Sequence, residues 1–135
     1  MWLDAKDLIP HDRTMRFIDA VRPNEGDIVA RGRVRNDNPL LEPKGLPAHV
    51  GIEYMAQAIA GLRGIAEPKS AKRSGVIVNI KEVNIHKPFF IVGEQIEVLV
   101  ESLYKDETFE VNLCRAIQGD EIISAEISVA EIVNE

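Results

Sequence analysis

Two side chains that could exchange protons lie one helical turn apart in the segment 45–64, GLPAHVGIEYMAQAIAGLRG. His49 and Glu53 are four residues apart, so they share one face if this segment is helical. A carboxyl group in an apolar cleft has a raised pKa and can act as a general acid, while an imidazole can act as the base. The nearest cation of the segment, Arg63, is too far along for an i, i+4 ion pair with Glu53. We therefore favour a catalytic Glu53 over a surface carboxylate or a structural helix pair.

The other histidines are His11, which follows Pro10, and His86, which lies in a strand-like segment. A loop histidine such as His11 is usually solvated when nothing else is known of it, and we expect His86 to point outward from its strand. Three scattered histidines and one cysteine provide no set of ligands at metal-binding spacing. The sequence also has no glycine-rich phosphate loop and no GxSxG elbow. We therefore expect no metal and no nucleotide.

The composition is that of a soluble globular chain. Its 135 residues, of which 45% are hydrophobic, predict a single domain over 1–135. No apolar run approaches the about 18 residues needed to span a bilayer, and the start of the chain lacks the pattern of a signal peptide. The one cysteine, Cys114, excludes an intrachain disulfide, and we expect it to be a small buried hydrophobe. These features favour the cytoplasm and exclude membrane insertion.

The net charge of −6 argues against nucleic acid as a partner, because phosphate binding needs a basic surface. One basic segment, with Lys69, Lys72 and Arg73, departs from this balance. It is either a docking patch for an acidic partner or a solvated loop.

The pattern of apolar residues predicts an α+β domain. Strands are expected over 15–21 and 27–35, separated by a turn. A helix follows from Pro47, with apolar residues at three- and four-residue spacing, and Gly64 and the Glu-Pro pair at 67–68 end it. Four long strand-like segments then follow, over 75–90, 94–104, 108–117 and 121–133. Tight turns between them favour antiparallel hairpins. A sheet of this kind leaves open edges, which invite pairing with a second chain.

The stretches LIPHDRTMRFIDAV and LPAHVGIEYMAQAIAG resemble the hotdog-fold β-hydroxyacyl-acyl-carrier-protein dehydratases, nearest to the small dehydratases of aryl-polyene biosynthesis. The first stretch has the Pro-His pair of the family, here at His11, followed by an apolar strand that contains Asp19. The second has the helix glutamate, here Glu53, followed by Met-Ala-Gln, which ends at Gln57. A later segment, VNIHKPFFIVGEQIEVLV, resembles the family's strand with a proline and a Gly-Asp/Glu pair.

The resemblance implies a curved antiparallel sheet wrapped around one long helix, in a dimer or higher homo-oligomer with the acyl tunnel between subunits. It implies dehydration of 3-hydroxyacyl thioesters, carried on acyl carrier protein or coenzyme A, to trans-2-enoyl thioesters. His11 would be the base and Glu53 the acid, and the substrate would be bound by Ala48, His49 and Gln57. No cofactor is implied, because the thioester itself acidifies C2. Asp19 either orients a histidine or has a turn or surface role.

The chain departs from typical fatty-acid dehydratases at one motif. Their Gly-His-Phe-Pro motif, which carries the catalytic histidine, lies about 14 residues before the helix glutamate. That position falls here near Pro39, in a segment without histidine. His49 could then pair with Glu53 or replace the missing base. The departure leaves open a thioesterase of the same fold, and a non-catalytic subunit that pairs with an active homologue.

Overall fold

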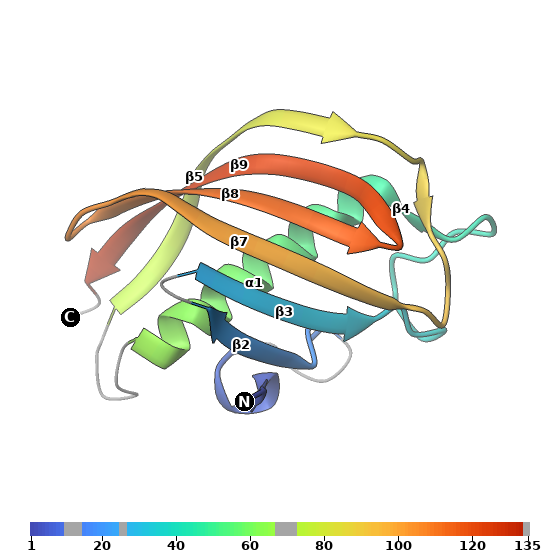
Figure 1. Cartoon of the computed structure of the whole chain (residues 1–135), viewed down its shortest axis with the longest axis horizontal. Helices are drawn as coiled ribbons and strands as arrows, with labels where there is room; N and C mark the ends of the chain where they lie inside the picture. The colour runs from blue at the N-terminus through green and yellow to red at the C-terminus, as the bar shows by residue number, and fades with distance from the viewer. Residues whose placement is uncertain (10–14, 25–26, 67–72, 134–135) are drawn as a thin grey trace.

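The structure is a computed structural model that describes residues 1–9, 15–24, 27–66 and 73–133 (Figure 1). One long helix lies between two groups of strands. In chain order they are β1 (Leu3–Asp4), η1 (Ala5–Asp7), β2 (Ala20–Asn24), β3 (Asp27–Arg33), β4 (Leu46–Pro47), η2 (Ala48–Val50), α1 (Gly51–Ala66), β5 (Arg73–Ile85), β6 (Phe89–Phe90), β7 (Gln95–Lys105), β8 (Phe109–Gln118) and β9 (Asp120–Val133).

Seven of the strands form one antiparallel sheet in the order β1-β2-β3-β7-β8-β9-β5. The sheet curves around α1, which lies along its concave face (Figure 1). In β7 the buried residues Ile96, Val98 and Val100 alternate with more exposed ones, as a sheet with one covered face requires. The predicted α+β hotdog fold is confirmed.

Large side chains on one side of α1 fill the core between helix and sheet. Tyr54, Met55 and Ile59 are buried there, with Ala58 between them. The helix was predicted to end at Gly64 and the Glu-Pro pair of 67–68, and α1 continues past Gly64 to Ala66, directly before that pair in the sequence. Gly64 serves close packing instead, since a Cβ at this position would lie 2.5 Å from the carbonyl oxygen of Leu8.

The first long strand begins later than predicted. The segment 15–21 was expected to be a strand, but β2 starts only at Ala20. The reason is that the backbone N–H groups of Phe17 and Ile18 donate to the side-chain oxygen of Gln57 on α1, at 2.7 and 3.2 Å. These donors are therefore not available to a neighbouring strand.

The last strand of the sheet, β5, has a strand neighbour on one side only, β9. Ile77 and Ile80 lie opposite the core residues Val129 and Ile127 of β9, so they project from the concave face. They are nevertheless 38% and 39% exposed. This chain therefore leaves the concave face of β5 partly uncovered.

Candidate active site

Glu53, the predicted acid, and His49, a predicted substrate contact and alternative base, share one open stripe of the helix. His49 lies in η2 and Glu53 in the first turn of α1, and both side chains are exposed. Ala56 and Ala60 continue the same helical face and are half-buried. We call His49, Glu53, Ala56 and Ala60 the open stripe of α1. Within the single chain, Glu53 is therefore outside the apolar core, and a dry cleft around it requires a further surface.

Gln57, which was predicted to bind substrate, holds the protein's own backbone. Its side chain is 1% exposed. Its oxygen accepts the two hydrogen bonds from Phe17 and Ile18, and its nitrogen donates to the carbonyl oxygen of Met15 at 2.6 Å. The observed role of Gln57 is to fix the backbone of 15–18 against α1, one turn after Glu53.

Ala48, the other predicted substrate contact, is 2% exposed at the start of η2. Its backbone N–H donates to the carbonyl oxygen of Pro88 at 2.9 Å. This donor is thus engaged in fixing the helix start to the segment before β6.

Several predicted residues cannot be placed beside Glu53. His11, Lys69 and Lys72 lie outside the described residues, as does the side chain of Arg73. His86 is exposed, as expected, and its Nε2 lies 2.8 Å from Glu121 Oε2. Glu121 is on β9, so His86 belongs to the surface of the sheet.

Three polar side chains lie near the buried Tyr54: Asp19, which the sequence had singled out, and Arg35 and Asn38, which sequence reasoning missed. Burial raises the pKa of the Asp19 carboxyl, and the neighbouring Arg35 opposes that rise. Burial also raises the pKa of Tyr54 well above its ordinary value, again with Arg35 opposing. The Tyr54 hydroxyl lies beside the Asn38 side chain but makes no hydrogen bond of good geometry. The charge of Arg35 thus acts on two residues, Tyr54 of α1 and Asp19, which directly precedes β2.

The described residues contain neither a metal cluster nor a membrane-spanning helix. In the part of the chain that the structure describes, no group of three or more His, Cys, Asp or Glu side chains is placed to hold a metal ion. Among the same residues, no helix has the length and apolar character needed to cross a membrane.

Solved structures share this fold at low sequence identity. The dehydratase heterocomplex ApeI:P from Xenorhabdus doucetiae matches with a TM-score of 0.84 and 22% identity, over 98% of this chain and 93% of that one. A variant of thioesterase PA1618 from Pseudomonas aeruginosa matches with a TM-score of 0.68 and 12% identity, over 87% and 82% of the two chains. Thioesterase HI1161 from Haemophilus influenzae matches with 0.66 and 14%, over 86% and 78%.

The sequence comparisons are more specific. No curated protein matches the sequence. The profile of the ApeP-like family, described as ApeP dehydratase, matches residues 3–134, which is nearly the whole chain. The chain therefore belongs to the ApeP-like family of dehydratases.

Proposed function

We propose that this chain dehydrates 3-hydroxyacyl thioesters, carried on acyl carrier protein or coenzyme A, within an assembly of two hotdog subunits. The observation that carries the proposal is the position of Glu53 on the open stripe of α1, in a chain of a dehydratase family. The stripe is open and β5 is partly uncovered on the same concave side of the sheet. A second subunit that covers both would place Glu53 in a dry cleft.

The free edge of β5 is the surface that such a subunit would use. An edge strand presents unpaired N–H and C=O groups, and here it also presents Ile77 and Ile80. Pairing with a second copy would give a symmetric dimer, which is the commonest oligomer of soluble proteins. A homologous subunit is the other possible partner, since the similar ApeI:P structure is described as a heterocomplex.

The reaction needs one base and one acid. We assign the base to His11, by resemblance, and it takes a proton from C2. The electron pair of that C–H bond forms the C2–C3 double bond as the C3–O bond breaks. Glu53, in its protonated form, then protonates the departing hydroxyl, and water and the trans-2-enoyl thioester are released. His49, one turn before Glu53, is the alternative base.

The thioester carbonyl gains negative charge when C2 loses its proton. The amino end of the helix favours such charge through its backbone N–H groups. Because the Ala48 N–H already donates to Pro88, this role would pass to the next N–H group, that of His49. A cofactor is not required in this scheme.

A thioesterase is the second candidate, because thioesterases PA1618 and HI1161 share the fold. In that reaction Glu53 would activate water, or attack directly, at the thioester carbonyl. The two reactions differ in their products. Dehydration leaves the thioester intact and adds a double bond, whereas hydrolysis releases a free thiol and a free acid.

The test is incubation of the purified protein with 3-hydroxyacyl thioesters, with water loss followed by mass and thiol release followed in parallel. It is run on the protein alone and mixed with a homologous dehydratase subunit. We expect enoyl product, and a loss of about 10²–10⁴-fold in kcat for Glu53→Gln and for His11→Ala. If His49→Ala loses the dehydratase activity and His11→Ala keeps it, the base is His49 and not His11.

Because Glu53 is exposed, Glu53→Gln should leave the free energy of unfolding within about 0.5 kcal/mol of that of the parent. Thiol release that is lost in Glu53→Gln would show that the chain is a thioesterase and not a dehydratase. If the mixture with a homologous dehydratase subunit keeps its full activity when this chain carries Glu53→Gln, this chain is a non-catalytic partner.

A further inference from the structure

The strand β5 runs antiparallel to the helix α1, from the carboxyl end of the helix to its amino end. At the carboxyl end, a Cβ at Gly75 of β5 would lie 2.8 Å from Arg63 Nε. At the amino end, a Cβ at Gly51 would lie 2.6 Å from a methyl group of Ile123, and Ile123 of β9 is paired with Ile85 of β5. The start of β5 and the end of α1 accordingly lie at the same end of the molecule (Figure 1).

Apolar side chains of α1 and β5 are left partly uncovered on the concave side of the sheet. The helix contributes Ala56 and Ala60 of the open stripe, both half-buried, and the strand contributes Ile77 and Ile80, which are 38% and 39% exposed. We call these four residues the α1–β5 surface. A second subunit laid over this surface would turn it into one wall of an apolar channel, because the small side chains of the helix leave room for a slender chain of carbon atoms.

Arg63 ends the α1–β5 surface with ion pairs that are nearly buried. Its Nη1 lies 3.6 Å from Glu110 Oε1, its Nη2 lies 3.6 Å from Glu131 Oε1, and its side chain is 18% exposed. It fills the space that a Cβ at Gly75 would take. An apolar side chain at this place could turn aside for a ligand, but a displaced Arg63 would leave two poorly solvated carboxylates without their cation. Arg63 is therefore a fixed wall.

We propose that Arg63 closes the channel that holds the acyl chain of the substrate and so limits the length of that chain. The proposal rests on the proposed function and deepens it, because that function sets the direction of the chain. With the thioester carbonyl at the N–H of His49 and C3 at Glu53, the carbon atoms beyond C3 run along the helix toward its carboxyl end. They pass Ala56 and Ala60 and then meet Arg63.

The helix sets the length that fits. Arg63 comes ten residues after Glu53, and at a rise of about 1.5 Å per residue these residues span about 15 Å. An extended alkyl chain, with C–C bonds of about 1.5 Å at about 111°, advances about 1.25 Å per carbon. About ten carbons beyond C3 therefore fit once the width of the Arg63 side chain is deducted. A dodecyl chain fits this space, whereas a hexadecyl chain meets the ion pairs.

The experiment measures binding by calorimetry, with S-octyl, S-dodecyl and S-hexadecyl coenzyme A. These thioethers are neither dehydrated nor hydrolysed, so the measurement does not require turnover. On the purified protein in its native assembly, we expect the dodecyl compound to bind at least about tenfold more tightly than the octyl compound, because its additional CH₂ groups are buried. The hexadecyl compound should bind no more tightly than the dodecyl compound.

Ala60→Leu should shorten the channel. Leucine is nearly as good a helix former as alanine, and here it fills the channel three residues before Arg63. This variant should bind S-octyl coenzyme A as the parent does, but the gain from octyl to dodecyl should disappear. Ala130→Leu is the matched control, because Ala130 is half-buried on β9 but on the convex face of the sheet. It should keep the length profile of the parent.

Arg63→Met combined with Glu110→Gln should lengthen the channel, since it removes the cation and one of the two carboxylates that hold it. In this double variant the hexadecyl compound should bind at least about tenfold more tightly than the dodecyl compound. A folded double variant that keeps the limit at dodecyl would overturn the role of Arg63.

The parent and Ala60→Leu decide the proposal without the double variant. Affinity that does not change with chain length in the parent, or that rises steadily to hexadecyl, would overturn it, and so would an unchanged profile in Ala60→Leu. A limit at dodecyl in a protein that converts no thioester would refute the proposed function alone. Dehydration of 3-hydroxyacyl thioesters with no limit of length would refute this inference alone.

Discussion

The side-chain oxygen of Gln57 lies 2.7 Å from the backbone nitrogen of Phe17, forty residues away in the sequence, and accepts its hydrogen bond. The same oxygen accepts from Ile18, and the Gln57 nitrogen donates to Met15. A single helix side chain thus satisfies three backbone groups of the segment that precedes β2. Because Gln57 is one turn after Glu53, this anchor also fixes the backbone next to the open stripe of α1.

Gln57→Leu should therefore cost much of the protein's stability. The change leaves the buried N–H groups of Phe17 and Ile18 without an acceptor, at about 1–3 kcal/mol for each unsatisfied group. We expect the free energy of unfolding to fall by about 2–4 kcal/mol, measured by urea denaturation.

Gln118→Leu is a matched control for that change. Gln118 makes the same kind of clamp, accepting from the Ile91 N–H at 2.6 Å and donating to the Ile91 carbonyl at 2.9 Å, but at an exposed place. Water can replace those bonds, so the loss should be below about 1 kcal/mol. Equal losses in the two variants would show that burial of the Gln57 anchor is not what matters.

The strands β7 and β8 could be predicted from sequence because their alternation is local. Buried and exposed residues alternate at a period of two along β7 and β8, and both strands agree with the predicted segments within about two residues. The strand expected over 75–90 is wrong in its extent, because β5 ends at Ile85 and Phe89–Phe90 form a separate strand, β6, that pairs with β4. Cys114 is fully buried in β8, as predicted. The start of β2 could not be predicted in the same way, because it depends on a hydrogen bond from the distant Gln57.

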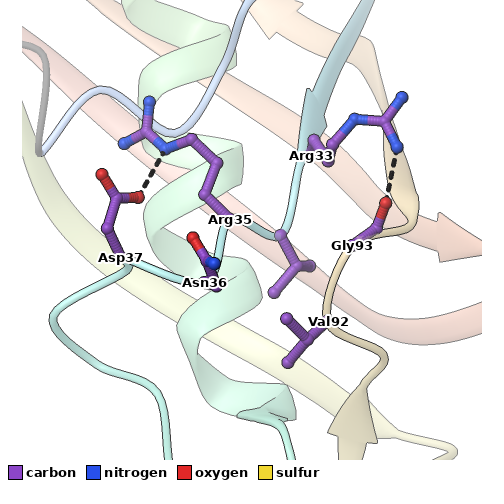
Figure 2. A pocket seen from close by; sticks show the side chains of 7 residues that line it. Arg33, Arg35, Asn36, Asp37, Val92 and Gly93 are labelled. Carbon is purple, nitrogen blue, oxygen red and sulfur yellow. Dashed lines mark hydrogen bonds and ion pairs between the residues drawn. The ribbon is translucent and has the colours of Figure 1, made fainter.

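Around the candidate site, too, some features follow from local sequence and others depend on residues that are far apart in the chain. The shared face of His49 and Glu53 follows from helical spacing alone, and the structure places both on one open stripe. An open hollow lined by Arg33 and Arg35 lies where the chain leaves β3 (Figure 2). It depends on the pairing of β3 with β7, which brings Gly93 to Val34. No local pattern in either segment contains that pairing, so the hollow becomes visible only in the folded chain.

The uncovered face of β5 predicts that Ile80→Lys will disrupt assembly without unfolding the subunit. Ile80 projects from the concave side and is 39% exposed, so a lysine is tolerated in a single chain but not under a second subunit. The mass in solution, measured by light scattering after gel filtration, should fall to that of one chain.

Val76→Lys tests whether dissociation by Ile80→Lys comes from the face that the lysine occupies or from the added charge alone. Val76 is 40% exposed on the same strand but lies opposite Ala130, on the other face of the sheet from Ile77 and Ile80. This variant should keep the assembly of the parent. Dissociation of both variants would indicate that any charge on β5 suffices.

Arg63 should stabilise the subunit by compensating two nearly buried carboxylates. Its Nη1 lies 3.6 Å from Glu110 Oε1 and its Nη2 lies 3.6 Å from Glu131 Oε1, and those side chains are 5% and 10% exposed. Arg63→Met removes the charge and keeps much of the apolar stem, so both carboxylates are left in a poorly solvated site. We expect a loss of about 3 kcal/mol in the free energy of unfolding.

Rescue by a second change separates the charge from the packing of Arg63. Glu110→Gln in the Arg63→Met background removes one uncompensated charge, and it should recover at least about 1 kcal/mol in the same denaturation experiment. A double variant no more stable than Arg63→Met would assign the loss to packing.

Gly64→Ala should destabilise the protein although alanine is the better helix former. Alanine is favoured over glycine within a helix by about 1 kcal/mol. A Cβ at Gly64, however, would lie 2.5 Å from the Leu8 carbonyl oxygen, and backbone cannot move aside as a flexible side chain can. We expect a net loss of about 1–3 kcal/mol, measured by thermal unfolding. A rise in Tm would mean that α1 does not approach Leu8 this closely.

The thiol of Cys114 should not react in the native protein. Burial raises the pKa of Cys114 to about 12, and the neighbouring Glu110 adds to the rise. The thiolate is the reactive form, so at pH 8 both its small population and its burial oppose attack. We expect no labelling by a thiol reagent at pH 8 over hours in buffer and complete labelling in urea. Labelling in buffer at a rate that rises with added urea below the unfolding transition would instead reveal local opening of β8.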